Sequence, residues 1–223
     1  MPTGTSARRP TPRHPAVSLA RLGARMAGLD FSPASLAEAR RLAEAAGHAI
    51  EFVEANVYDA ARVLGRERFD FVFTGIGALC WLPRVQPWAE LVAELLRPGG
   101  WLFIRGGHPM LWSLDERTDR LLVVEYAYFE HEQPIVEVEG GTYVETDATL
   151  EHNVSHSWNH GLGEIVTALL DAGMQLTTLV EHDSVPWEAL PGLMERTDEK
   201  EWRLVDRPSR LPHSYTLRAI KPA

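Results

Sequence analysis

The side chains best suited to chemistry in this sequence are two histidines in polar surroundings. His108 follows two glycines at the end of an apolar run, where an imidazole can act as a general base or contact a substrate. The alternative for the same residue is a loop or helix-capping histidine. We expect His160 and Trp158 to form the polar, aromatic wall of a substrate pocket, with His160 near the substrate. Tyr126 is a further candidate, either as a lid contact or as core of its own segment.

The histidine spacing before this point also raises the question of a metal ion. His152, His156 and His160 lie four residues apart. On a strand, His152 and His156 share one face, whereas His160 lies beyond the following turn. No cysteine or carboxylate completes a close set of ligands. We therefore expect no metal site.

These residues must be positioned by a central β-α-β unit. We expect its first strand at Phe69 to Thr74, its helix at Trp88 to Leu96 and its second strand at Trp101 to Ile104. The strand runs are short, apolar and rich in β-branched and aromatic side chains, which is typical of strands buried on both faces. Because ligands bind at the carboxyl ends of parallel strands, a site is expected directly after each of these two strands.

The chain before this unit has the pattern of a second parallel pair. The sequence predicts the end of a helix at 17–23, a strand at 24–29, a helix at 34–46, a strand at 50–53 and a short helix at 59–64. Ser32 is a good N-cap for the second of these helices.

The chain after Ile104 has a different pattern. Residues 121–129, 135–138 and 142–153 alternate loosely between apolar and polar types, which predicts two to four antiparallel strands. They form an expected β-insertion at about 109–158 that covers the ligand face. A helix at 159–172, a strand at 176–180, an irregular stretch with a short helix at 187–206 and a closing strand at 214–220 complete the prediction.

Composition excludes several classes of protein. The 223 residues include 22 basic and 31 acidic side chains, a net charge of −9, which argues against a nucleic-acid or anionic-membrane surface. The single cysteine, Cys80, rules out an internal disulfide and fits a reducing cytoplasm, where we expect the protein. No apolar run approaches the roughly 20 residues needed to cross a bilayer. Residues 1–16 are expected to be a disordered tail, and residues 17–223 one domain.

The order of the expected elements resembles that of the class I S-adenosylmethionine-dependent methyltransferases. The segments Gly28 to Pro33, Phe52 to Val57 and Phe69 to Phe73 are similar to that family's second, third and fourth strand motifs, and Leu95 to Gly100 is the most specific match. The resemblance implies a Rossmann-like three-layer α/β fold, with a mostly parallel sheet and a reversed C-terminal edge strand. It also implies S-adenosylmethionine as the cofactor.

An adenosine site is expected at the ends of the first two strands. A carboxylate at the position of Asp30 can accept hydrogen bonds from both ribose hydroxyls, although an Asp that only starts the next helix is the alternative. Phe31 and Val57 would hold the adenine between them, and the Asn56 amide would bond its edge. The family more often has Asp at this last position, but Asn can donate as well as accept.

The remaining cofactor contacts are expected from Thr74, Gly75 and Ile76, which would line the methionine and adenine side. Gly75 would let the backbone approach the ligand closely.

The front of the chain departs from the family pattern. The family begins with a strand and a glycine-rich loop, followed by a helix, and here the helix is expected only from about Val17. The absent strand is central in the fold, so its loss would expose strand edges and remove backbone N–H groups that meet the ligand.

The first functional hypothesis is a methyltransferase that acts on a small molecule by in-line methyl transfer. A second is a truncated, non-catalytic binding module with the same fold. A third, a nicotinamide-dependent oxidoreductase, can also use Asp30, but the turn before Trp101 and the terminal antiparallel pair count against it. The sequence does not identify the atom that is methylated, nor the oligomeric state.

Overall fold

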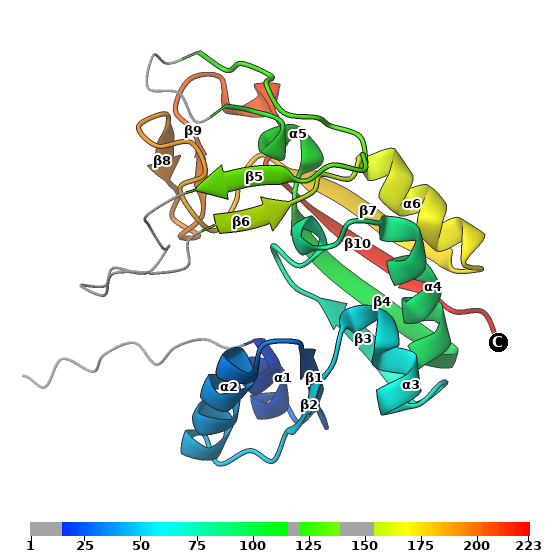
Figure 1. Ribbon diagram of the computed structural model, residues 1–223. Helices are drawn as coiled ribbons and strands as arrows, with labels where there is room; N and C mark the ends of the chain where they lie inside the picture. Colours follow the sequence, from blue (N-terminus) through cyan, green and yellow to red (C-terminus); the bar gives the residue numbers. More distant parts are fainter. Residues whose placement is uncertain (1–14, 116–120, 139–153) are drawn as a thin grey trace, which may run out of the picture. The chain divides into compact units, whose positions relative to one another are not determined.

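A computed structural model of the chain describes residues 15–115, 121–138 and 154–223. The chain divides into two compact units, of which unit 1 ends at Gly65 and unit 2 runs from Arg66 to Ala223 (Figure 1). Each unit has its own β-sheet, and the two units are described separately.

Unit 1 contains a parallel strand pair and the helix that connects it. Strand β1 (Ala27–Asp30) pairs with β2 (Glu51–Glu54), with Asp30 opposite Glu54, and helix α2 (Pro33–Ala45) connects the two. Both strands and the helix are therefore confirmed, with ends shifted by a few residues. The unit is completed by α1 (Pro15–Arg21), the 3₁₀ helix η1 (Val57–Asp59) and α3 (Ala60–Leu64).

Helix α2 begins and packs as its sequence dictates. The Ser32 hydroxyl accepts a hydrogen bond from the Ser35 N–H at 3.2 Å, which caps one of the first free donors of the helix. Its buried residues share one face at helical spacing and are Leu36, Ala39 and Ala43. The helix packs against both β1 and β2.

Unit 2 is built on a four-stranded sheet in the order β3-β4-β10-β7. Strand β3 (Phe69–Thr74) runs parallel to β4 (Leu96–Gly107), whereas β10 (Ser214–Ile220) runs antiparallel to both β4 and β7 (Gln175–His182). The predicted β-α-β unit and the predicted pairing of the last two strands are confirmed. The reversed strand lies inside the sheet, however, and β7 rather than β10 forms the edge.

Helices α4 (Val85–Leu95) and α6 (Leu162–Asp171) lie side by side over one face of this sheet (Figure 1). Alternate strand residues point toward them, because successive side chains of a strand face opposite sides. Leu102, Ile104 and Leu217 are at most 1% exposed. They pack in the main hydrophobic core with Trp88, Ala89, Val92, Ile165, Ala168 and Leu169.

Strand β3 differs from its prediction. It was expected to be buried on both faces, yet within the described residues it pairs only with β4 and forms an edge of the sheet. Its three phenylalanines are half-buried and belong to neither hydrophobic core. The physical reason is that a strand without a second neighbour among the described residues keeps one side open.

The insertion after β4 is only partly a β-structure. Strand β5 (Ile135–Val138) is confirmed and pairs antiparallel with β6 (Val154–Ser157). The strand expected at 121–129 is wrong, because this segment forms only one bridge, between Leu114 and Val124, and bonds to the turn after the short helix α5 (Pro109–Trp112). The strand expected at 142–153 lies outside the described residues.

A second hydrophobic core lies in the chain segments that follow the carboxyl ends of β4 and β7. Strands β8 (Met194–Arg196) and β9 (Trp202–Leu204) form an antiparallel hairpin where an irregular stretch with a short helix was predicted. We call α5, this hairpin and the core that they share the cap; its core residues include Leu111, Leu114, Val185, Leu190, Met194, Leu204 and Leu211. The 3₁₀ helices η2 (Leu79–Trp81) and η3 (Pro208–Arg210) complete the unit.

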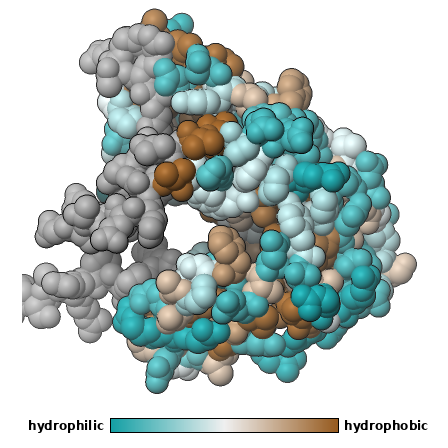
Figure 2. Space-filling model, viewed as in Figure 1, coloured by the Kyte–Doolittle hydropathy of each residue, from teal (hydrophilic) through white to brown (hydrophobic). Residues whose placement is uncertain are grey.

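Hydrophilic side chains cover most of the visible surface of the described residues (Figure 2). In that part of the chain, no helix is long and apolar enough to cross a membrane.

The core of unit 2 makes a first prediction. Leu102→Ala removes a fully buried side chain between the sheet and its helices, and should lower the free energy of unfolding by about 2–5 kcal/mol. Leu170→Ala is the matched control, because Leu170 is 51% exposed on α6. Urea unfolding followed by circular dichroism measures both. Equal losses in the two variants would contradict the assignment of this core.

Candidate functional site

The strongest candidate site in unit 1 lies at the carboxyl ends of β1 and β2. Asp30 ends β1, and its Oδ1 accepts the Ser32 N–H at 2.8 Å, which is the helix-starting role named as the alternative. Asn56 follows β2, and its Oδ1 accepts the Tyr58 N–H at 3.0 Å. Both contacts fix the side chains and use one oxygen each. No other hydrogen bond of the Asp30 carboxylate or of the Asn56 amide nitrogen occurs among the residues described.

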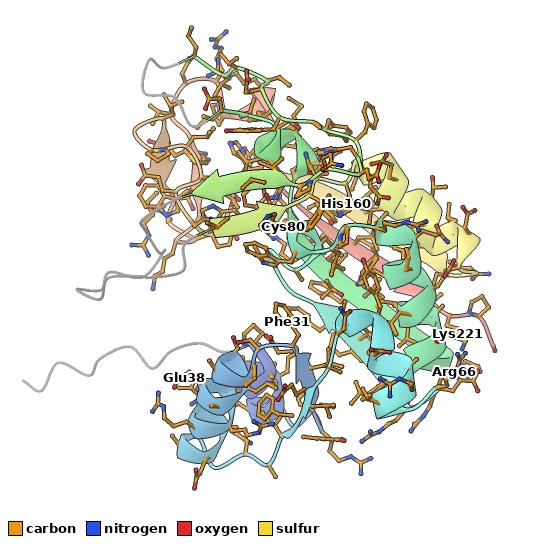
Figure 3. The ribbon with its side chains drawn as sticks, in the orientation of Figure 1. Phe31, Glu38, Arg66, Cys80, His160 and Lys221 are labelled. Carbon is orange, nitrogen blue, oxygen red and sulfur yellow. The ribbon has the colours of Figure 1, made fainter. Side chains whose placement is uncertain are left out.

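Apolar groups stand beside these two polar side chains. Phe31 is 75% exposed and projects from unit 1 directly after β1 (Figure 3). Val57 follows Asn56 and is half-buried. An exposed aromatic ring next to a carboxylate and an amide provides an apolar surface and directional polar groups in one place. This combination fits an adenosine group, because the adenine needs apolar contact and the ribose needs acceptors.

The other predicted cofactor residues lie in unit 2, directly after β3. Thr74 is buried at the strand end, and Ile76 is 40% exposed. A Cβ on Gly75 would lie 3.3 Å from the ring of Phe73, so a larger residue would crowd the strand end. This segment therefore lies at the carboxyl edge of the sheet, and its predicted contact with the cofactor stays a prediction.

His108 has a structural role at the start of helix α5. It is the N-cap of α5, and its Nδ1 accepts the Met110 N–H at 3.0 Å. Its Nε2 lies 2.9 Å from Glu181 Oε1, a contact that becomes an ion pair when the ring is protonated. The ring is 4% exposed, and burial lowers the pKa of His108 while Glu181 opposes that shift. The contacts match the capping alternative, and the predicted catalytic role stays a prediction.

His213 lies beside His108 at the start of β10. The two are linked through the backbone, since His108 N–H donates to the His213 carbonyl at 2.9 Å. His213 is fully buried, and neither of its ring nitrogens has a partner with hydrogen-bond geometry among the described residues. Burial lowers the pKa of His213; Asp183 raises it, and His108 lowers it further. The folded protein therefore favours a neutral ring here.

His160 ties together segments that are far apart in the chain. Its Nε2 lies 2.8 Å from the Leu82 carbonyl, and its Nδ1 lies 3.0 Å from Glu130 Oε2. The same carboxylate oxygen of Glu130 accepts the Val85 N–H at the start of α4 at 2.8 Å. Figure 3 shows His160 close to Cys80, in the loop after β3. Both ring nitrogens are engaged, so the contacts of His160 give no support for the catalytic role, which stays a prediction.

Asn159 completes this arrangement. The next helix was expected to begin at this residue, but Gly161 is the N-cap of α6. The Asn159 amide nitrogen instead donates to the carbonyls of Pro109 and Ala127 at 2.8 and 3.0 Å, and lies 3.2 Å from Ser113 Oγ. We call Asn159, His160 and Glu130 the polar knot. It holds the loop after β3, the start of α4 and the cap helix α5 in a fixed relation.

The predicted pocket residues Trp158 and Tyr126 lie next to the polar knot. The Trp158 N–H donates to the Cys80 carbonyl at 2.8 Å, and the Tyr126 N–H donates to the Ser113 carbonyl at 3.1 Å. The indole nitrogen of Trp158 is buried, with no hydrogen-bond partner in the described part of the chain. It is thus a donor available to a ligand, and its place in a substrate pocket stays a prediction.

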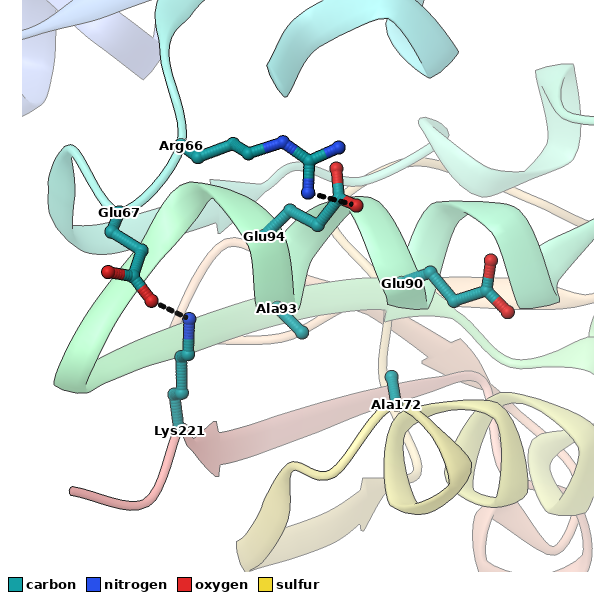
Figure 4. A pocket seen from close by; sticks show the side chains of 7 residues that line it. All are labelled: Arg66, Glu67, Glu90, Ala93, Glu94, Ala172 and Lys221. Carbon is teal, nitrogen blue, oxygen red and sulfur yellow. Dashed lines mark hydrogen bonds and ion pairs between the residues drawn. The ribbon is translucent and has the colours of Figure 1, made fainter. Parts of the chain in front are cut away.

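A polar hollow of about 520 Å³ opens at the opposite end of the sheet (Figure 4). Its charged groups largely neutralise one another: Arg66 pairs with Glu94 at 2.7 Å, and Lys221 with Glu67 at 3.1 Å. Because it lies beside the amino end of β4 and its cations are engaged, it does not fit the expected site.

No three histidine, cysteine, aspartate or glutamate side chains come together as metal ligands among the described residues. His156 lies on β6, whereas His152 falls outside the description.

Sequence reasoning missed Glu130 and its role in the polar knot. Its partners His160 and Val85 lie 30 and 45 residues away, so no local spacing marks the contact. The only local signal is the polar pair Asn159 and His160 before an apolar helix.

The polar knot predicts that removing the buried His160 destabilises the protein, whereas removing an exposed histidine does not. His160→Ala leaves the Leu82 carbonyl and one bond of Glu130 without a buried partner, and should lower the free energy of unfolding by about 1–3 kcal/mol. His156→Ala is the matched control, because this histidine is exposed. Thermal unfolding of both variants measures the difference, and a similar small effect in both would argue against the knot.

The buried histidines predict acid sensitivity. Because burial lowers the pKa of His213 below its usual 6.5, the unfolded chain binds a proton that the folded chain rejects. Stability from this group is therefore complete above about pH 6.5 and falls as the pH drops below it. His213→Leu should lose less thermal stability than the wild type between pH 7.5 and 5.5. An unchanged pH dependence would show that His213 is not responsible.

Comparison with known proteins agrees with the fold. Residues 14–102 match the family model described as a methyltransferase domain. This segment includes the candidate adenosine residues Asp30 and Asn56 and the strand end at Thr74. No curated protein sequence matches the chain.

Several solved structures share the fold at low sequence identity. A Listeria monocytogenes protein described as an S-adenosylmethionine-dependent methyltransferase has a TM-score of 0.63 and 17% sequence identity. The alignment covers 93% of this chain and 84% of the Listeria protein. Proteins from Methanosarcina mazei and Mesorhizobium loti with similar descriptions have TM-scores of 0.56 and 0.55 and identities of 18% and 19%. The alignments cover 92% and 88% of this chain, and 86% and 80% of those proteins. The expected resemblance to the class I S-adenosylmethionine-dependent methyltransferases is confirmed for the fold, which these solved structures share, and residues 14–102 match a methyltransferase domain.

Proposed function

We propose that this chain transfers the methyl group of S-adenosylmethionine to a small organic molecule, and that Asp30 is its principal cofactor contact. The observation that carries the proposal is the pair of polar side chains at the adjacent carboxyl ends of β1 and β2, each held by one backbone hydrogen bond. The match of this segment to a methyltransferase domain supports it.

Residues of unit 1 would bind the adenosine part. The Asp30 carboxylate has one oxygen beyond the one that holds Ser32, and would accept hydrogen bonds from the ribose hydroxyls. The exposed ring of Phe31 and the side chain of Val57 would contact the adenine, while the Asn56 amide nitrogen would donate to its edge. When bound, S-adenosylmethionine supplies an electrophilic methyl group that a nucleophilic atom of the substrate displaces in line.

Residues of unit 2 would line the methionine side and the substrate. Thr74, Gly75 and Ile76 present a strand end with a backbone that a side chain would crowd. The cap follows the strand ends of β4 and β7, and its apolar core would exclude water and select the substrate. A net charge of −9 favours a small substrate over nucleic acid.

A non-catalytic binding module with the same fold is the second candidate. The observation in its favour is the open edge of β3, since the described residues of unit 2 hold no strand beside it. Such a module would bind S-adenosylhomocysteine without consuming S-adenosylmethionine in the presence of any acceptor.

The proposed cofactor contact predicts the effect of a charge change. Asp30→Asn keeps an oxygen for the Ser32 N–H but removes the carboxylate, and should weaken S-adenosylhomocysteine binding about 10-fold to 100-fold, because hydrogen bonds to charged groups are the stronger ones. Glu54→Gln is the matched control, since Glu54 lies opposite Asp30 on β2 and is exposed. Calorimetric titration of the 223-residue chain measures both.

Equal affinities of Asp30→Asn and the wild type would contradict the cofactor role of Asp30. Binding without turnover of labelled S-adenosylmethionine across a panel of oxygen, nitrogen and carbon acceptors would favour the non-catalytic module.

A further inference from the structure

The buried side chain of His108 joins the cap to the sheet. Its Nδ1 accepts the Met110 N–H at 3.0 Å and so caps α5. Its Nε2 lies 2.9 Å from Oε1 of Glu181 on β7. Its backbone N–H donates to the carbonyl of His213, the residue before β10, at 2.9 Å. One residue therefore controls the start of α5, where the chain passes from β4 into the cap.

The contact with Met110 determines which nitrogen of a neutral His108 ring carries the proton. A backbone N–H can only donate, so Nδ1 carries no proton, and the single proton is on Nε2, next to Glu181. A charged ring carries a proton on both nitrogens, so it can pair with Glu181 but can no longer accept the Met110 N–H. The N-cap of α5 and the positive charge of His108 therefore exclude each other.

The groups around His108 determine which form the folded protein favours. Among the described residues, the titratable side chains that face it are Glu181 on β7 and two residues of the β10 segment, His213 and Tyr215. Asp183 in turn faces His213. Burial lowers the pKa of His108, and the Glu181 carboxylate opposes that shift without reversing it. The neutral, capping form is thus complete above about pH 6.5 and is lost as the pH falls further.

Helix α5 is sensitive to its N-cap because it is short. It has four residues, too few to form a stable helix without contacts from outside. Leu111 packs in the core of the cap, and the Pro109 carbonyl accepts a hydrogen bond from the Asn159 amide of the polar knot at 2.8 Å. Helix α5 therefore links the sheet, the polar knot and the core of the cap, so loss of its first contact loosens the cap where it meets β4.

We propose that His108 is a proton-controlled N-cap: its neutral ring holds α5 in place at the end of β4, and its charged ring pairs with Glu181 and releases the start of α5. The two states use exclusive contacts of one side chain, which makes the cap a pH-sensitive switch. The switch regulates the order of the segment that follows β4. It does not depend on the proposed enzymatic activity.

Amide hydrogen exchange of the full chain, measured by NMR at pH 7.5 and 5.0 and corrected for intrinsic rates, tests the switch. Protection of the Leu111 amide should fall about fivefold or more at the lower pH relative to Val92 in the core of α4, as expected for the loss of one N-cap. His108→Asn should remove this difference, because asparagine caps helices and does not titrate. His156→Asn is the matched control: this histidine is exposed, and the pH response should stay that of the wild type.

A second variant and the ring nitrogens separate the switch from a change in packing. Glu181→Gln removes the partner of the charged ring from a half-exposed position, so the loss of protection should move to a lower pH. ¹⁵N spectra of the His108 ring should show a proton on Nε2 alone at pH 7.5 and on both nitrogens below the transition.

Several results would overturn the proposal. They are a proton on Nδ1 of His108 at pH 7.5, equal relative protection of Leu111 at the two pH values, or a loss that persists in His108→Asn. An unshifted transition in Glu181→Gln would remove the role of the ion pair. A transition that disappears in His213→Leu would assign the titration to that residue instead.

Discussion

The arrangement of the candidate site depends on parallel strand pairing. Two adjacent parallel strands must end at the same edge of a sheet, so residues that follow them meet even when they are far apart in sequence. In unit 1 this constraint brings Asp30 and Asn56 together, although 26 positions separate them, as their numbers show. In unit 2 it places Thr74 at the same edge as the end of β4, from which the chain enters the cap.

The polar knot adds a second constraint, which acts on loops rather than on strands. Asn159 donates to the Pro109 carbonyl, and the ring of His160 lies between the Glu130 carboxylate and the Leu82 carbonyl. Buried polar groups in such a network are costly to leave without partners, so the loop after β3 and the start of the cap cannot move independently. His160, which the sequence suggested as a substrate-pocket residue, thus has contacts that account for its burial by a structural role. Methyl transfer depends mainly on positioning, and a rigid frame around the strand ends serves that need.

Local patterns predicted the strands, helices and pairing, because apolar periodicity and capping residues act over a few positions. The strand Ser214 to Ile220 and the helix capped by Ser32 are examples. The β8–β9 hairpin was missed because its strands are only three residues long, and the segment 121–129 was misassigned because its alternation does not continue into a partner strand. For the site, Asp30 and Asn56 followed from strand ends, whereas Glu130 depends on long-range contacts that no spacing reveals.

The central claim is that unit 1 binds the adenosine part of the cofactor at the ends of β1 and β2. Chemical-shift mapping of the ¹⁵N-labelled chain with S-adenosylhomocysteine tests it most directly. The account predicts the largest shifts at Asp30, Phe31, Asn56 and Val57, with little change along the exposed face of α2. Saturable binding with its largest shifts elsewhere, such as around Arg66 and Lys221, or no shifts in a folded chain, would contradict it.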